Sequence, residues 1–98
     1  MKNEKTPKGQ AVGKVTEAER DEIKRLFERK NGLLELFKSI PDASHPLYDR
    51  VVQDMGETAT KFQAWWDDKS RQYRWTGAAG GHWEIDFETC EIFLKKSR

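Results

Sequence analysis

Cysteine, histidine and proline are scarce in this chain of 98 residues, and it has no apolar run long enough to cross a bilayer. A single cysteine, Cys90, excludes a disulfide within the chain. The two histidines, His45 and His82, lack the paired ligand spacing of a zinc site, so no metal and no other cofactor is predicted. No secretory leader is recognisable at the start, and we therefore expect a cytoplasmic protein with no membrane partner.

An excess of charge of one sign is also missing, because the formal net charge is +1. The first fifteen residues hold four lysines against one glutamate, which leaves the rest slightly acidic. A slightly acidic body argues against nucleic acid as a partner, since such proteins normally present a concentrated basic face. We predict that residues 1–14, with Pro7, Gly9 and Gly13, form a flexible basic arm, and that residues 15–98 form a single small α+β domain.

A capping box marks the start of the first predicted helix. Thr16 and Glu19 have the spacing at which each side chain satisfies a free backbone N–H of the first turn. Apolar residues then recur at helical spacing, which predicts one helix over residues 17–39, ended by Pro41. Asn31-Gly32 is a weak point at which this helix could end and a second begin, but the apolar register continues across it.

A second apolar stripe predicts a helix over residues 46–74. Ser44 is a suitable N-cap, and Pro46 is tolerated in a first turn. The short connection between the two helices predicts that they lie antiparallel, as a helical hairpin. Two helices bury only one stripe each, so either another element or a second copy of the chain must cover the open side.

A C-terminal β-hairpin is the expected cover. Trp83, Ile85 and Phe87 alternate with polar residues, as a half-buried strand requires. A loop over residues 87–90 would put Cys90 where a backbone with positive φ is needed, and would pair Trp83 with Leu94 and Ile85 with Ile92. The predicted fold is therefore an antiparallel two-helix hairpin followed by a C-terminal β-hairpin whose apolar face packs near Phe62.

All four tryptophans fall in the last third of the chain, and they supply the candidate binding residues. Trp65 and Trp66 are adjacent on a helix and point about 100° apart, so both cannot face one narrow seam. We prefer to place both in the core, under the hairpin. If one is exposed at the rim, beside two aspartates, it suits a binding hot spot. The candidate partner-binding residues are Trp65, Trp66, Asp67, Asp68 and Trp75.

Catalytic groups do not form a motif in this sequence. Cys90 has no histidine at a spacing that would activate it. The acidic residues of the hairpin could serve acid–base chemistry, but alternating charge on an outer strand face gives the same pattern; they are Glu84, Asp86, Glu88 and Glu91. We therefore predict a protein that is not an enzyme, and keep a small enzyme using these residues as a third alternative.

Four segments of the chain resemble a small family of bacterial proteins. They are residues 12–16, 25–30, 65–68 and 83–92, which read VGKVT, RLFERK, WWDD and WEIDFETCEI. The family comprises the modification system proteins of gene clusters that mature peptides with repeated Cys-X-X-X units, alongside radical-SAM enzymes. The resemblance implies an accessory role, with the precursor peptide or the modifying enzyme as partner, and it assigns no catalytic residue. The predicted function is a non-enzymatic adaptor that binds a peptide or protein. The alternative is a small regulatory protein, phage-encoded or antitoxin-like, whose basic arm contacts nucleic acid.

Overall fold

The computed structural model describes residues 9–96, which form two helices and a three-stranded antiparallel sheet. The predicted α+β class, with two helices before a C-terminal β-hairpin, is therefore confirmed. One further strand precedes the helices. In chain order the elements are β1 (Gln10–Lys14), α1 (Glu17–Lys38), α2 (Tyr48–Tyr73), β2 (Gly81–Ile85) and β3 (Glu91–Lys96).

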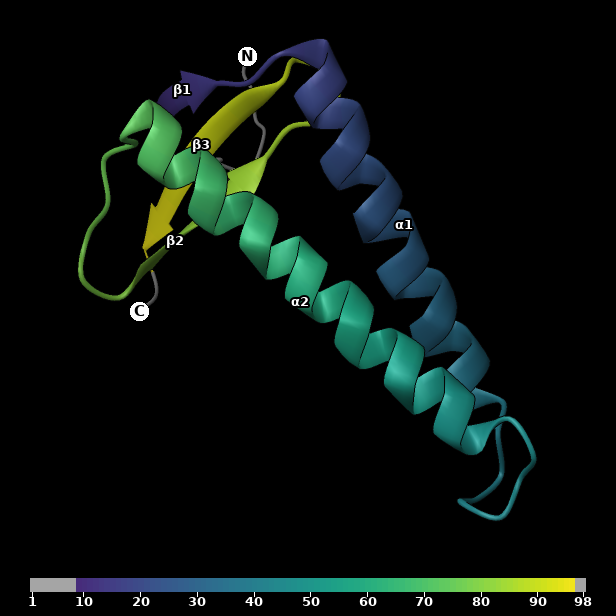
Figure 1. Cartoon of the computed structure of the whole chain (residues 1–98). Coiled ribbons are helices and arrows are strands. Elements are labelled where there is room, and N and C mark those ends of the chain that lie inside the picture. The colour runs from purple at the N-terminus through teal and green to yellow at the C-terminus, as the bar shows by residue number, and fades with distance from the viewer. Residues whose placement is uncertain (1–8, 97–98) are drawn as a thin grey trace, which may run out of the picture.

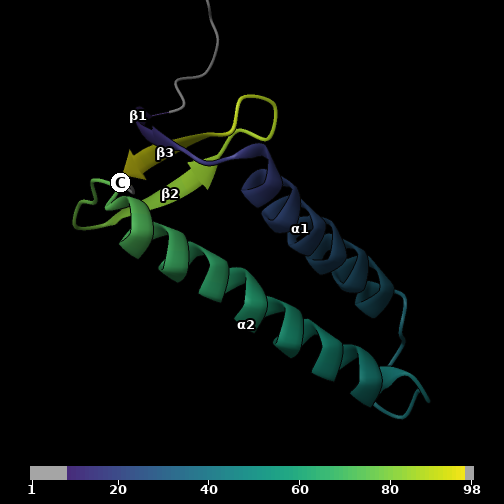
Figure 2. The ribbon, with the colours of Figure 1, turned by 45° about the horizontal axis from the view of Figure 1, so that its top comes forward.

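The two helices lie side by side and are joined by residues 39–47 at the end of the molecule far from the sheet (Figure 1). Both views show them separating toward the sheet, which lies across the open end (Figure 2). The sheet therefore covers only that end of the helical pair. Among the described residues neither helix is long and apolar enough to span a membrane.

Helix α1 begins as predicted. The Thr16 hydroxyl accepts a hydrogen bond from the backbone N–H of Glu19 (3.1 Å), and the Glu19 carboxylate accepts one from the backbone N–H of Thr16 (2.9 Å). The helix runs without interruption through Asn31 and Gly32 to Lys38. The weak point in the sequence therefore does not divide it.

Helix α2 begins two residues later than predicted, at Tyr48, and the prediction of Ser44 as its N-cap is wrong. The N-cap is Leu47, which makes no side-chain capping bond. The Asp42 side chain engages Ser44 instead, accepting a hydrogen bond from its backbone N–H (2.9 Å). An aspartate that bonds two residues ahead forms a local turn, and this turn holds Ser44 away from the helix start.

The β2–β3 hairpin has the predicted register. Trp83 lies opposite Leu94, and Ile85 lies opposite Ile92. Cys90 has the predicted positive φ, 66°, which the loop requires at its last position. The Asp86 side chain closes the loop by accepting a hydrogen bond from the backbone N–H of Glu88 (2.8 Å).

The prediction of a flexible arm is wrong for residues 10–14, which form strand β1 on the far side of β3. Gln10 lies opposite Leu94 and Gly13 opposite Ile92, and the register shifts between Ala11 and Gly13. The extra residue at Val12 is accommodated as an irregularity of the edge strand. The predicted domain therefore has to include these residues, whereas the arm prediction for residues 1–8 falls outside the described part of the chain.

The core lies between the sheet and the open end of the helical pair. Its buried members are Val15, Ile23, Trp65, Trp75, Cys90 and Ile92. Trp75 is its centre, because its ring lies within 5.7–6.5 Å, centroid to centroid, of four other aromatic rings, those of Trp65, Trp66, Tyr73 and Trp83. Gly13 of β1 lies against this indole so closely that a Cβ there would stand 2.7 Å from Trp75 Nε1.

Candidate partner-binding surfaces

The five candidate binding residues separate into core and surface. Trp65 is 4% exposed and Trp75 is 7% exposed, so neither offers a partner much area. Trp66 is half-buried, with its ring 5.0 Å from that of Trp65 and nearly perpendicular to it. Asp67 and Asp68 are exposed on α2. Of the three candidate tryptophans, Trp66 is the one at the rim of the core.

Trp66 lines a hollow that we call the aromatic groove. Two adjoining hollows, of about 350 and 330 Å³, share the side chains of Phe62, Trp66 and Trp83. Together they follow β2 from Gly81 to Ile85 and reach Phe87 in the loop after it. Helix α2 forms one wall, and Ile23 and Phe27 of α1 form the end nearest the β2–β3 loop. Aromatic side chains dominate this lining, as they do in sites that bind apolar segments of a partner.

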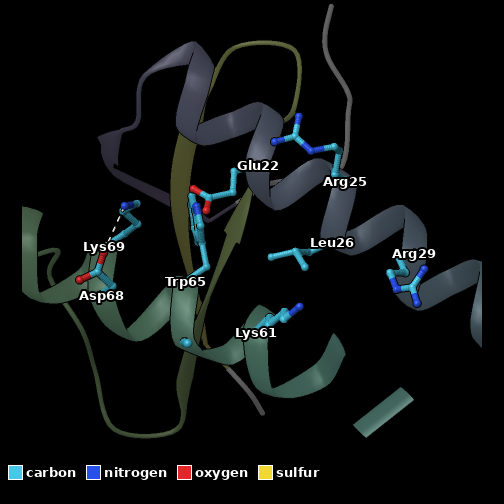
Figure 3. A pocket seen from close by; sticks show the side chains of 9 residues that line it. Glu22, Arg25, Leu26, Arg29, Lys61, Trp65, Asp68 and Lys69 are labelled. Carbon is cyan, nitrogen blue, oxygen red and sulfur yellow. Dashed lines mark hydrogen bonds and ion pairs between the residues drawn. The ribbon is translucent and has the colours of Figure 1, made fainter. Parts of the chain in front are cut away.

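A second hollow, which we call the basic cleft, opens between the helices on a different face (Figure 3). It has a volume of about 510 Å³ and a floor of Leu26, Ala64 and Trp65. Its rim carries four cationic side chains, Arg25, Arg29, Lys61 and Lys69, against two carboxylates, Glu22 and Asp68. Lys69 is turned toward Asp68 (3.2 Å), and Arg29 lies 3.7 Å from Asp54. Arg25 and Lys61 have no ion-pair partner within residues 9–96, so the cleft suits an anionic group that also carries an apolar part.

Glu19 links the start of α1 to the end of α2. Its carboxylate accepts a hydrogen bond from the Tyr73 hydroxyl (2.6 Å) and lies 3.7 Å from the Lys69 ammonium. Burial opposes the charged form, but the bonds from Tyr73 and Thr16 and the charge of Lys69 outweigh it and lower the pKa of Glu19. The same bond, together with burial, raises the pKa of Tyr73. This network fixes the two helices to each other beside the core.

We expect Tyr73→Phe to lower the free energy of unfolding by about 1.5 kcal/mol at neutral pH, because a hydrogen bond to a carboxylate is lost. The ring, which stacks on Trp75, is retained. The pKa of Glu19 is lowered on folding, so its contribution is present above its ordinary value near 4.5 and is lost as the pH falls through the folded-state pKa. The cost of the substitution should therefore shrink in acid.

Urea denaturation near neutral pH and at about pH 3 measures this difference. Tyr48→Phe is a matched control, because within the described residues the Tyr48 hydroxyl has no hydrogen-bond partner, while its ring lies 5.7 Å from that of Phe37 and would be retained. A Tyr73→Phe cost that is equal at the two pH values would contradict the role given to Glu19.

The groups considered for catalysis lie apart. Cys90 is 6% exposed in the loop before β3, whereas His45 lies in the connection at the opposite end of the molecule. His82 is on β2, where its ring bonds to Glu84 (2.8 Å). This bond, with help from Lys95, lowers the pKa of Glu84 against the effect of burial. Within residues 9–96 no group of three or more histidine, cysteine or acidic side chains is placed to hold a metal ion.

Sequence reasoning missed both hollows, although it named Trp66 from the groove and Trp65 and Asp68 from the cleft. The four-residue spacing of Arg25 and Arg29 was a signal for a basic stripe, but it does not reveal which part of α2 lies opposite. Predicting the groove would have required the position of β2 relative to both helices, and no local sequence pattern contains that information. Comparison of the chain with protein-family models, curated proteins and solved structures finds no match.

Proposed function

We propose that this protein is a non-enzymatic adaptor that binds a peptide or protein partner in the aromatic groove. The observation that carries the proposal is the half-buried Trp66, standing with Phe62 and Trp83 along a hollow at the edge of the core. Tryptophan in a concave, largely apolar site contributes more to binding than most other side chains, because it brings much apolar area at little cost in conformational entropy.

The placement of the candidate catalytic groups supports an adaptor over an enzyme. A cysteine nucleophile needs a neighbouring base and access to substrate, and Cys90 is buried in a loop at the opposite end of the molecule from His45. The carboxylate of Glu84 is engaged by His82 and by Lys95 (3.1 Å). Because its pKa is lowered, Glu84 stays ionised near neutral pH. It therefore acts as the charged member of an ion pair and not as a proton donor.

The resemblance to modification system proteins suggests which partner to look for. A precursor peptide or the enzyme that modifies it would offer an apolar segment to the groove. The alternative function, binding of nucleic acid by a basic arm, depends on the four lysines of the first fifteen residues. Lys14, the last of them, gives it no support, because Lys14 belongs to strand β1. The other three, Lys2, Lys5 and Lys8, lie outside the described residues.

Site-specific photo-crosslinking tests the proposal. We would place p-benzoylphenylalanine at Gln63, an exposed residue that lines the groove, in the protein expressed in its native cells. Gln53 is a matched control on the same helix: both glutamines are exposed, and each bonds to an acidic side chain four residues on, Asp67 and Glu57 respectively. We expect one defined adduct from position 63 and none from position 53, identified by mass spectrometry.

Trp66→Ala in the same background should abolish the adduct in a chain that still melts cooperatively. Equal crosslinking from positions 53 and 63, or none from either in cells that express the protein, would count against the groove as the partner site.

A further inference from the structure

Strand β2 is an edge of the sheet, because the strand order is β1-β3-β2 and only β3 pairs with it in the described chain. The Asp86 N–H donates to the Glu91 carbonyl (2.9 Å), which makes these two residues a hydrogen-bonded pair at the end of the ladder. Backbone bonding in an antiparallel pair alternates residue by residue. Glu84 therefore points its N–H and C=O groups toward β3, whereas Trp83 and Ile85 point theirs to the open edge.

The aromatic groove lies along this same strand. Its lining includes residues of β2 from Gly81 to Ile85, and its opposite wall is made by Phe62 and Trp66 of α2. At Gly81 the backbone N–H already donates to the Ala78 carbonyl (2.9 Å), and Gln63 and His82 make that end of the groove more polar. From Trp83 to Ile85, backbone groups that face the open edge therefore run beside a largely apolar part of the groove. An extended chain satisfies both at once, since it bonds along the edge and turns every second side chain into the groove.

The two edges of the sheet are protected differently. The β1 edge carries Lys14 and a register irregularity at Val12, and both features discourage pairing with another strand. Strand β2 reads Gly-His-Trp-Glu-Ile, with no lysine, no proline and an uninterrupted register against β3. The edge beside the groove is the one left open to pairing.

We propose that the partner binds as an added strand: an extended peptide segment, with apolar side chains at alternating positions, pairs with the open edge of β2 and fills the aromatic groove. This inference rests on the proposed function and specifies the partner's conformation. A single extended chain is favoured over a second copy of this protein, because both helices contribute walls to the hollow beside the edge and a second copy would bring its own helices into that space.

The test uses the full chain and a phage-displayed library of random dodecapeptides, with selected peptides synthesised and their affinities measured for wild type and Trp66→Ala. Each peptide is then made in two N-methylated forms, with methyl groups on one or the other set of alternate residues. Strand addition predicts that one form loses affinity by about tenfold or more, since its edge-facing N–H groups are removed, while the other binds nearly as well as the parent.

Amide hydrogen exchange gives an internal control within β2. On peptide binding, the N–H groups of Trp83 and Ile85 should exchange at least about tenfold more slowly, because they gain partners. The N–H of Glu84 already bonds to β3 and should change much less.

The outcomes separate this inference from the proposed function. Peptides that depend on Trp66 but are equally affected by both methylation patterns, or that show apolar residues at helical spacing, overturn strand addition and leave the adaptor function standing. A different outcome is that, in the absence of peptide, the N–H groups of Trp83 and Ile85 exchange more slowly as the protein concentration rises. That result would identify a second copy of the chain as the occupant of the edge, and it would also overturn binding of a peptide strand. A library that yields no peptide dependent on Trp66 contradicts both proposals.

Discussion

Replacing Trp75 with alanine is expected to lower the free energy of unfolding by about 3–5 kcal/mol, as large aromatic deletions in a core do. Trp75 is 7% exposed, and its ring lies near four other aromatic rings and against Gly13. Packing between the sheet and α2 therefore converges on one side chain. A loss of this size is comparable to the whole stability of a small domain, so the variant should be largely unfolded.

Denaturation followed by far-ultraviolet circular dichroism measures this effect. Val52→Ala, on an exposed face of α2, is the control and should stay within about 0.5 kcal/mol of wild type. The loss of stability in Trp75→Phe should lie between those of Trp75→Ala and Val52→Ala. Phenylalanine retains a ring and removes a buried indole N–H that has no hydrogen-bond partner within the described residues. A Trp75→Ala chain that melts like wild type would show that the sheet and the helices are held together elsewhere.

Gly13→Ala is expected to destabilise the protein by about 1–3 kcal/mol, the usual cost of overpacking. The added Cβ would meet Trp75 Nε1 at 2.7 Å and Cδ1 at 2.8 Å, and the indole has little room to retreat because it is enclosed by the core. Either β1 moves away from β3 or the tryptophan cluster shifts.

Gly32→Ala is the matched control and should have the opposite sign. Gly32 lies inside α1, and nothing is within 4 Å of its Cβ position. Alanine there should stabilise the helix by about 0.5–1 kcal/mol, since glycine is a poor helix former. Thermal melting of both variants tests this prediction. Equal changes in melting temperature for Gly13→Ala and Gly32→Ala would mean that the contact between Gly13 and Trp75 does not constrain the fold.

Short-range signals predicted most of the local structure correctly. The capping box at Thr16 and the hairpin register at Ile85 are both set by residues within about ten positions of one another, so the sequence displays the whole interaction. Cys90 could be assigned its positive φ from loop length alone, although its side chain is not the usual choice for that conformation.

The pairing of strands that are distant in the sequence could not be predicted from local patterns. Strand β1 contains a glycine and ends on a lysine, and it becomes a strand because β3, at the other end of the described chain, offers it an edge. The same limit applies to Trp65 and Trp66. Helical spacing shows that they diverge, but only the position of the sheet determines that Trp65 is enclosed and Trp66 stands at the groove.

The central place of β3 has a consequence for how the chain folds. Every strand contact in the described structure involves residues 91–96, which are synthesised after all the other elements. The helical pair can form from neighbouring residues, but β1 must wait for a partner separated from it by nearly the whole described chain. Contacts between residues so far apart in the sequence raise the contact order, which slows folding. On the ribosome, the apolar side chains at the open end of the helical pair, such as Ile23 and Trp65, should therefore stay uncovered until β3 emerges. During that interval the chain is most exposed to aggregation or to capture by a chaperone.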